Sequence, residues 1–246
     1  MKNLRWGILL GCFVFIFADA YVGAEVSSSN SKNWEGSAEL SVIATNGNSR
    51  ELILLGKNNF TYHWSQSALE LIGRAAATTE QDVTTNEAYF ASEEFTRTLT
   101  GKNYIYEKTA WDKDRFSGIQ DQYNLSAGLG RNILDSSKDK FISEIGAGYI
   151  NEERASASRD DFASGRVYAK YVRVLNVGSK FTQNIEYFAN FNDGASYRLN
   201  TETNLTVSIS AHCSLKFSYL WRRINQPTPS FGKDKATTSL ALVVDY

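Results

Sequence analysis

The sequence predicts an all-β protein: a transmembrane antiparallel up-and-down β-barrel of about twelve strands, following a cleaved N-terminal signal peptide. Three observations lead to this prediction. An apolar leader opens the chain, alternation of apolar and polar residues fills most of the rest, and the last ten residues end in an apolar stripe. Inside a bilayer every backbone hydrogen bond must be satisfied internally, and a closed barrel achieves this with strands that alternate between lipid and lumen.

The first 24 residues have the layout of a secretory signal. Lys2 and Arg5 give a positive start to an apolar run that is shorter than the roughly 20 residues of a spanning helix. Small residues follow the run, and cleavage is expected after Ala20 or Ala24, with Ala24 preferred. The expected organisation is a signal peptide at 1–24, a short polar segment at 25–33 and an outer-membrane barrel at 34–246.

Composition excludes several classes of function. The 246 residues include 26 basic and 27 acidic side chains, and loss of the signal leaves 24 and 26, a net charge of −2. The chain therefore has no basic excess with which to bind nucleic acid. Cys213 is the cysteine that remains after cleavage, which excludes an intramolecular disulfide. Both prolines fall within 226–234, so long strand ladders meet no proline elsewhere.

Alternation predicts twelve strands in order along the chain. Each is ten or more residues long, which is enough to cross a bilayer when tilted and longer than the mean of about 5–6 in soluble sheets. An even number returns the chain to the side on which the barrel began. The expected strands are residues 34–44, 51–62, 67–77, 87–98, 103–113, 119–132, 139–151, 162–175, 179–191, 195–209, 213–225 and 235–246.

Several strands separate clearly into two faces. In the strand at 195–209, Leu199 and Leu205 share one face, while Arg198 and Glu202 share the other. Apolar residues facing outward and polar residues facing inward are typical of a membrane barrel with a polar lumen. A soluble sandwich would show the same alternation with the apolar face in a core.

In two strands the sequence does not decide which face points to the lumen. Glu93 lies on an otherwise apolar face of the strand at 87–98, and Glu107 does so in the strand at 103–113. Either these carboxylates lie near a rim of the barrel, or the strand is shifted by one residue, which would exchange its faces.

The C-terminal strand carries a lipid-facing stripe. Leu240, Leu242, Val244 and Tyr246 share one face, and the chain ends on the aromatic residue. This arrangement resembles the C-terminal assembly signal of bacterial outer-membrane barrels. The expected partners are therefore the barrel-assembly machinery and the surrounding outer-membrane lipid and lipopolysaccharide, with the cell outer membrane as the expected location.

Connections alternate between short and long. Short turns are expected at 63–66, 100–102, 176–178 and 210–212, and longer polar links at 78–86, 114–118, 152–161 and 226–234. Short turns are typical of the periplasmic end and long loops of the extracellular end. On the long-loop side, Asn46–Asn48 and Asn192–Gly194 are expected to form hairpin turns, because Gly and Asn accept positive φ angles.

Five motifs carry a resemblance to a known family. They are Trp34–Gly36, Thr45–Ser49, Trp111–Ile119, Ala127–Gly130 and Glu144–Tyr149, of which the part at 112–119 is the most distinctive. With these motifs the chain resembles the YdiY-like family of salt-induced outer-membrane proteins, a domain-of-unknown-function family numbered 481. The resemblance covers most of the mature chain and implies an outer-membrane barrel, without catalytic residues that could be transferred.

The sequence predicts no enzyme and no catalytic, cofactor or metal residues. A hydrolase needs a histidine beside a nucleophile or an activated water, but His63 and His212 both fall at expected periplasmic turns. One cysteine and two separated histidines do not have zinc-ligand spacing. The glycine pairs Gly128/Gly130 and Gly146/Gly148 lie inside strands with no following helix, so they are expected to leave room in a crowded lumen or to let strands bend.

Two acidic groups remain as candidate cation ligands. Asp112, Asp114 and Asp121 form one group, and Glu152–Glu153 with Asp160–Asp161 form the other. Oxygen ligands suit calcium or magnesium, although neither spacing matches a calcium-binding loop. The alternative is solvated loop charge facing lipopolysaccharide.

Charged residues on the inward faces give the most informative pattern. Acids and bases are nearly balanced, whereas a channel for sugar acids or phosphates is expected to show a ladder of one sign. Mixed charges can pair across the lumen and close it. The expected lumen charges are Glu35, Glu39, Lys57, Glu70, Arg74, Glu144, Arg166, Lys170, Glu186, Arg198, Glu202, Lys216 and Arg222.

Two functions follow from these features. The first is a barrel with a narrow or gated polar lumen that serves envelope integrity and stress adaptation or lets small solutes pass. The second is a scaffold whose extracellular loops, such as 226–234, bind a partner. A salt-responsive role, in which ionic strength screens the lumen pairs, rests on the family resemblance, and an outer-membrane hydrolase is the least expected function.

Overall fold

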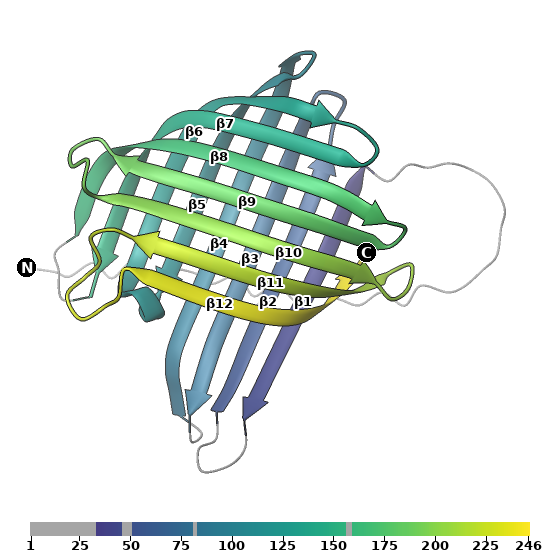
Figure 1. The fold of residues 1–246 in the computed structure, drawn as a ribbon. Helices are drawn as coiled ribbons and strands as arrows, with labels where there is room; N and C mark the ends of the chain where they lie inside the picture. Colours follow the sequence, from purple (N-terminus) through teal and green to yellow (C-terminus); the bar gives the residue numbers. More distant parts are fainter. Residues whose placement is uncertain (1–32, 46–50, 81–82, 156–158) are drawn as a thin grey trace, which may run out of the picture. The chain divides into compact units, whose positions relative to one another are not determined.

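The computed structural model describes residues 33–45, 51–80, 83–155 and 159–246. Within these residues twelve antiparallel strands form a closed barrel, in which each strand pairs with its sequence neighbours and β12 pairs with β1 (Figure 1). The expected all-β barrel fold is confirmed. The strands are β1 (Trp34–Thr45), β2 (Glu51–His63), β3 (Ser67–Glu80), β4 (Val83–Thr100), β5 (Asn103–Asp114), β6 (Ile119–Asp135), β7 (Asp139–Arg154), β8 (Asp160–Asn176), β9 (Ser179–Asn190), β10 (Tyr197–Ser208), β11 (Cys213–Ile224) and β12 (Asp234–Asp245).

Helical structure contributes little to this fold. A single-turn 3-10 helix, η1 (Arg115–Ser117), lies in the connection between β5 and β6. Among the described residues no helix has the length and apolar character needed to cross a membrane. The expected signal peptide and polar segment, residues 1–32, lie outside the described residues, as does the turn expected at Asn46–Asn48.

The barrel places apolar side chains outside and polar side chains inside. On β6, Leu125 and Leu129 are 54% and 59% exposed, whereas Asn124 and Ser126, on either side of Leu125 in the sequence, are buried. The C-terminal stripe follows the same rule, since Leu240, Leu242, Val244 and Tyr246 are all exposed. An apolar outer surface suits lipid, and the inverted arrangement of a soluble sandwich is excluded for these strands.

The register of β4 and β5 is as the alternation predicts. Glu94 pairs opposite Lys108, and these two side chains turn inward to form an ion pair of 3.1 Å between Nζ and Oε2. Glu93 and Glu107 consequently lie on the outer face, where the Thr109 hydroxyl donates a hydrogen bond of 2.9 Å to Glu107 Oε1. A register shift is therefore not the reason for the two carboxylates.

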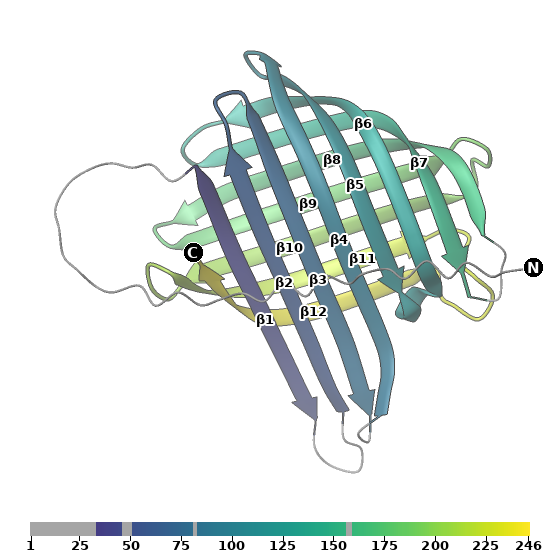
Figure 2. The ribbon, with the colours of Figure 1, turned by 180° about the vertical axis from the view of Figure 1, so that it is seen from behind.

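The short and the longer connections lie at opposite ends of the barrel as expected. The long link expected at 78–86 is wrong, because β3 continues to Glu80 and β4 already begins at Val83. The short turns share one end with the start of β1 and the end of β12, and Gly101 and Gly178 supply the positive φ angles of two of them, 50° and 90° (Figure 2). At the opposite end, the expected positive φ at Gly194 is wrong. There the Asp193 side chain accepts the backbone N–H of Ala195 at 3.0 Å, which shapes the turn through a side-chain acceptor.

The seam between β1 and β12 is paired over part of its length. The ladder runs from Ser37 opposite Asp245 to Leu40 opposite Leu242, whereas β1 pairs with β2 along its whole length. Beyond this ladder β1 continues beside β2 while β12 continues beside β11 at a steep angle to β1 (Figures 1 and 2). The edges of the two strands therefore separate toward the long-loop end.

The terminal aromatic residue covers the paired part of the seam from outside. The backbone N–H of Tyr246 donates to Gly36 O at 3.0 Å, and the Tyr246 ring lies where a side chain on Gly36 would be. Asn58 Nδ2 on β2 donates to the Tyr246 hydroxyl at 2.9 Å. The last residue thus connects β12 with β1 and β2 beside the short-turn end.

Candidate functional site

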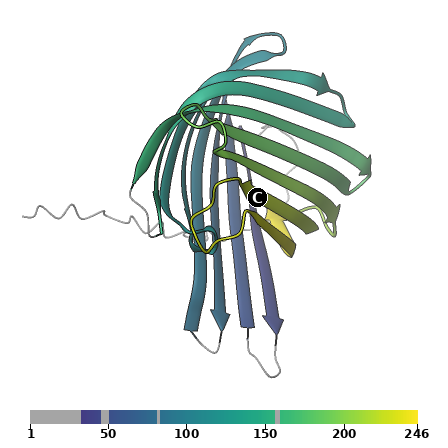
Figure 3. The same ribbon diagram turned by 60° about the vertical axis from the view of Figure 1, so that its left-hand side comes forward.

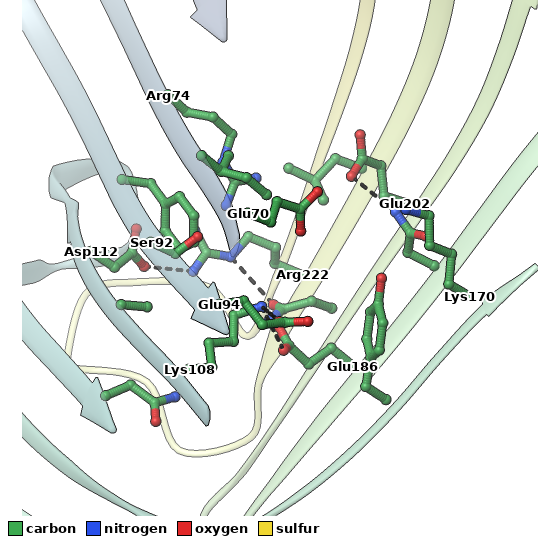
Figure 4. Close-up of a pocket in the computed structure, with 18 of the residues that line it drawn as sticks. Glu70, Arg74, Ser92, Glu94, Lys108, Asp112, Lys170, Glu186, Glu202 and Arg222 are labelled. Carbon is green, nitrogen blue, oxygen red and sulfur yellow. Dashed lines mark hydrogen bonds and ion pairs between the residues drawn. The ribbon is translucent and has the colours of Figure 1, made fainter. Parts of the chain in front are cut away.

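The interior of the barrel contains a charged cavity of about 240 Å³. Five acids and five bases line it, so its formal charge is balanced (Figure 4). These charged residues are Lys57, Glu70, Arg74, Glu94, Lys108, Asp112, Lys170, Glu186, Glu202 and Arg222. A balanced lining produces no net field to concentrate ions of one sign.

One group of ion pairs crosses the lumen between strands that are not neighbours. Arg222 on β11 binds two carboxylates of β5, with 2.8 Å from Nη2 to Asp112 Oδ2 and 3.0 Å from Nη1 to Asp114 Oδ2. Lys235 on β12 binds the same Asp114 at 3.0 Å. Asp114 is fully buried and also accepts the Ser117 hydroxyl of η1 at 2.9 Å. The walls formed by β5 and β11–β12 are therefore held together across the interior.

A second crossing group lies around Arg198 on β10. Its guanidinium binds Gln122 on β6 and Glu152 on β7, which are separated from β10 by intervening strands. Glu152 is buried, and Arg154 holds its other oxygen at 2.7 Å. This group restricts the lumen near the long-loop end.

A third group is centred on Arg166 of β8. Its Nη1 lies 2.7 Å from Glu144 Oε2 and its Nε lies 2.8 Å from Glu186 Oε1. The Tyr104 hydroxyl donates to Glu144 Oε1 at 2.8 Å, and the Tyr106 ring centroid is 4.9 Å from the guanidinium carbon. Charge-assisted hydrogen bonds and a cation–π contact thus surround a cation that has no exposed side-chain surface.

Glycines on the facing strands make room for these aromatic rings. A side chain on Gly130 would overlap the Tyr104 ring, and one on Gly146 would overlap the Tyr106 hydroxyl. The expectation that the strand glycines leave room in a crowded lumen is confirmed at these positions.

Glu39 organises the interior side of the seam. Lys216 on β11 reaches past β12 to bind Glu39 on β1, with 2.9 Å from Lys216 Nζ to Glu39 Oε1. Lys57 Nζ on β2 lies 3.8 Å from the same Glu39 oxygen. Glu202 lies 3.8 Å from the same Lys216. The group joins both sides of the seam where the backbone ladder is still formed.

Within the described part of the chain, Arg74 on β3 lines the charged cavity without an ion-pair partner. Its guanidinium carbon lies 4.0 Å above the Phe90 ring, and its Nε is buried with no hydrogen-bond partner. Among the described residues it forms no ion pair within 4.0 Å, and Figure 4 draws no contact to it, whereas Arg222 in the same cavity is joined to Asp112. A buried donor without an acceptor is unfavourable. Arg166 Nη2 also lacks a partner, but Arg166 binds two carboxylates, whereas Arg74 binds none of the described carboxylates, so Arg74 is a candidate to bind an acidic ligand.

Connections at the long-loop end of the barrel pack against one another over this interior. Figure 3 shows the yellow β11–β12 connection beside the short η1 turn. Phe231 of this connection packs where a side chain on Gly118, directly after η1, would be. Arg154 Nη1 donates to the Gln226 backbone oxygen at 2.6 Å, and Lys235 Nζ lies 4.3 Å from the Phe116 ring centroid. The segment at 226–234 therefore contacts the barrel mouth.

Comparison with known proteins agrees with this architecture. The family model described as "Protein of unknown function, DUF481" matches residues 38–246. The chain belongs to the DUF481 family. The "Uncharacterized protein YdiY" of Escherichia coli (strain K12) is 28% identical over 192 residues, which are 78% of this chain and 75% of that protein. The family resemblance carried by the sequence motifs is thus confirmed.

Solved structures similar to this member of the DUF481 family are outer-membrane barrels. The COG4313 outer membrane channel from Pseudomonas putida F1 aligns over 90% of this chain and 100% of its own, with a TM-score of 0.50 and 10% identity. The translocator domain of the autotransporter NalP from Neisseria meningitidis aligns over 89% of each chain, with a TM-score of 0.49 and 8% identity. At this identity the likeness concerns the fold of the barrel.

Most of the expected lumen charges lie in the groups described above, and Glu35 is the exception. Its side chain is 77% exposed and lies 3.5 Å from His63 Nε2 at the short-turn end, because it is the second residue of β1. Glu70 lines the charged cavity and accepts Asn59 Nδ2 at 3.1 Å, and Lys170 lines the same cavity.

Within the part of the chain that the structure describes, the sequence prediction missed several lumen charges: Glu94, Lys108, Asp112, Asp114, Glu152, Arg154 and Lys235. The alternation of β4 and β5 already contained the signal for Glu94 and Lys108. Asp114 and Glu152 were assigned to loops because the expected strands ended at 113 and 151, whereas β5 and β7 continue to 114 and 154.

The structure separates the candidate cation ligands. Asp112 and Asp114 bind Arg222 inside the barrel, whereas Asp121 accepts Trp111 Nε1 at 3.0 Å. Alternation along β5 places Asp112 inward and Trp111 outward, so the three acids do not converge. In the second group, Glu152 faces the lumen while its neighbour Glu153 pairs with Arg159 at 3.3 Å. In each group, therefore, two of the carboxylates bind arginine side chains: Asp112 and Asp114 in the first, Glu152 and Glu153 in the second.

Proposed function

We propose that this member of the DUF481 family is a non-enzymatic barrel of the outer membrane whose lumen is kept narrow by crossing ion pairs. Such a lumen excludes large molecules and confines passage to water, ions and small solutes. The observation that carries the proposal is the binding of Arg222 on β11 to Asp112 and Asp114 on β5, from opposite walls of the barrel.

Stability alone does not account for these pairs. Desolvating two charges offsets most of their attraction, and apolar side chains of similar volume often stabilise a protein as well or better. A pair that spans the lumen has a second effect that an apolar side chain on one wall does not have. It fixes the distance between two walls that share no backbone hydrogen bonds.

Ionic strength gives the crossing pairs a connection to envelope stress. Arg222 and Lys235 have side chains that are 24% and 31% exposed, so mobile ions reach these pairs more readily than the enclosed pair of Arg166 and Glu144. At physiological ionic strength the screening length is about 8 Å, and it shortens as salt is added. The proposal therefore includes a lumen that becomes more permissive as external salt rises.

Single-channel conductance in planar bilayers tests the proposal. The full-length chain is expressed, purified from outer membranes and compared with Arg222→Met, which removes the crossing cation and retains an unbranched side chain. We expect the variant to conduct more than the wild-type protein, because two walls lose their connection. Ion selectivity, read from the reversal potential in a salt gradient, should shift toward cations because Asp112 and Asp114 lose a counter-charge.

The adjacent arginine provides a matched control. Arg223 lies on the other face of β11 and pairs with Asp234 at 2.8 Å, the same distance as the pair of Arg222 and Asp112. Its partner is on the neighbouring strand β12, so this pair does not cross the lumen. Arg223→Met should leave conductance unchanged. Equal conductance of Arg222→Met and the wild-type protein would refute the proposal.

A further inference from the structure

A second cavity, of about 490 Å³, lies where β1 and β12 separate. Its lining includes inward-facing residues of β12, such as Thr237 and Ser239, together with the outward-facing Ala236 and Thr238. Outward-facing residues of β3 and β4, Ala75 and Tyr89, line it as well, although these strands are paired on both sides. The cavity borders β12 along the stretch where its ladder with β1 has ended.

The walls of this seam cavity, as we name it, are largely apolar. Elsewhere the inward positions carry mostly polar groups, but here β2, β3 and β4 present aliphatic and aromatic side chains. They include Ile53, Leu55, Ala76, Ala88 and Phe90, with Phe116 and Leu220 opposite. Its volume falls within the range of about 300–1,000 Å³ that is usual for small-molecule sites. Such a lining suits a hydrocarbon chain better than a hydrated ion.

The seam cavity is restricted at both ends of the barrel. Toward the short-turn end, Glu39 and Lys216 join β1 to β11 inside, and Tyr246 covers the ladder outside. Toward the long-loop end, Lys235 and Phe116 lie in contact, and Lys235 also binds Asp114. The side that faces the bilayer, between the separated strands, lacks an equivalent backbone ladder.

Charge within the cavity identifies the polar part of a ligand. Its four lining carboxylates, Glu39, Asp112, Asp114 and Glu202, each have a lysine or arginine within 4.0 Å. Arg74 lines the same cavity with its Nε buried and unpartnered. Ser41 on β1 also lines it, and its buried hydroxyl has no hydrogen-bond partner. Two donors thus lack acceptors beside an apolar space.

We propose that the seam cavity binds a single-chain amphiphile with an anionic head group, which enters from the bilayer between β1 and β12. The carboxylate or phosphate of the head group accepts hydrogen bonds from Arg74, and the chain lies against Leu55, Ala88 and Phe90. This site adjoins the lumen passage proposed above and shares Asp112 and Arg222 with it, but binding of the amphiphile does not require that passage. Arg74 lies on the border of the two cavities, so the head group points toward the charged one.

Fluorescence of 11-(dansylamino)undecanoate tests binding to the full-length protein in phosphatidylcholine nanodiscs, with empty nanodiscs as the blank. We expect saturable binding that dodecanoate or dodecyl phosphate displaces, and the better competitor identifies the head group. Dodecanol, which has the chain without the charge, should compete at least about tenfold more weakly. The absence of saturable binding above the blank, or equal competition by dodecanol, would overturn the proposal.

Matched variants locate the site. Arg74→Gln should weaken binding at least about tenfold, whereas Arg173→Gln, which removes an exposed cation that lines neither cavity, should leave it within about twofold. Ala88→Leu fills the seam cavity and should also weaken binding, while Ala91→Leu on the exposed face of β4 should not. Heat-modifiable migration in gels verifies that each variant is folded. If Arg74→Gln does not fold, the pair at Ala88 and Ala91 still decides the proposal.

The route of entry has its own test. Thr238→Trp places a large side chain at the outer edge of the seam cavity and should slow association of probe that is already dissolved in the bilayer. Ala91→Trp, on the outer surface of β4, is the control. An unchanged association rate for Thr238→Trp would refute entry through the seam.

Discussion

Removal of the Arg166 guanidinium gives a quantitative test of how the lumen charges depend on one another. Arg166 and Glu144 are 0% and 1% exposed, and their nearest atoms are 2.7 Å apart. In Arg166→Met the Glu144 carboxylate keeps the Tyr104 hydroxyl but loses its cation. Breaking a buried pair by removing one partner costs about 3–5 kcal/mol of unfolding free energy, mainly because a charge is left uncompensated.

The second carboxylate that binds Arg166 should contribute less to this loss. Glu186 is 20% exposed and retains Lys108 at 3.9 Å, so it keeps both solvent and a counter-charge. The prediction for Arg166→Met is therefore a loss of about 3–5 kcal/mol that arises chiefly at Glu144. Equilibrium unfolding in urea, followed by tryptophan fluorescence of the protein in phosphatidylcholine vesicles, measures it.

The double variant decides whether this reasoning is correct. Glu144→Gln combined with Arg166→Met replaces the carboxylate that has lost its counter-charge by a neutral amide. The amide oxygen can still accept a hydrogen bond from the Tyr104 hydroxyl. We expect the double variant to be more stable than the sum of the single losses predicts, with a coupling energy of about 1–3 kcal/mol. Additivity of the single losses to within about 0.5 kcal/mol would refute the argument. As a comparison, Arg173 is 57% exposed and its Nε lies 3.9 Å from Asp139 Oδ1. Arg173→Met should therefore lower the unfolding free energy by much less than Arg166→Met does.

Two further predictions concern close packing. Gly130→Ala forces a methyl group into the Tyr104 ring and should lower the unfolding free energy by about 1–3 kcal/mol. A methyl group on Gly56 meets open space, so Gly56→Ala should not lower it. Urea unfolding of both variants measures the difference. Tyr246→Ala removes the ring that covers Gly36 and should reduce the yield of folded, heat-modifiable barrel, whereas Tyr246→Phe should retain it. Equal yields of the two Tyr246 variants would contradict a role for the ring.

The alternation of apolar and polar residues predicted which side chains face the lumen, but not which residues of opposite walls contact one another. Alternation alone places Arg198 and Glu202 on the inner face of β10, because successive side chains of a strand point to opposite sides. It contains no information about which opposite wall each one meets. Arg222 and Asp112 are 110 residues apart and meet because strand tilt brings β11 over β5 inside the closed barrel.

Errors at strand ends had the largest effect on the predicted site. An expected end at residue 151 placed Glu152 in an extracellular loop, where it was considered as a cation ligand. In the structure β7 continues to Arg154, and Glu152 becomes a buried partner of Arg198. A shift of a strand end by three residues thus converts a solvated charge into a lumen charge.

The separation of β1 and β12 was also beyond the sequence pattern. Both strands alternate along their whole lengths, so nothing in the alternation predicts that their ladder ends at Leu40 opposite Leu242. The seam depends on interactions of β12 with parts of the chain more than a hundred residues away.

One arrangement of charges accounts for both the narrow lumen that we propose and the separation of β1 and β12 at the seam. Asp114 on β5 binds Arg222 of β11 and Lys235 of β12, and both contacts hold these strands toward the far wall of the barrel. β1 remains paired with β2 along its full length, so it does not follow them. Backbone groups left unpaired along the seam are costly in a bilayer unless they border a cavity that contains water or a ligand. The ion pairs that we propose to restrict passage along the barrel axis therefore also favour a site at its side, where Arg74 lacks an acceptor.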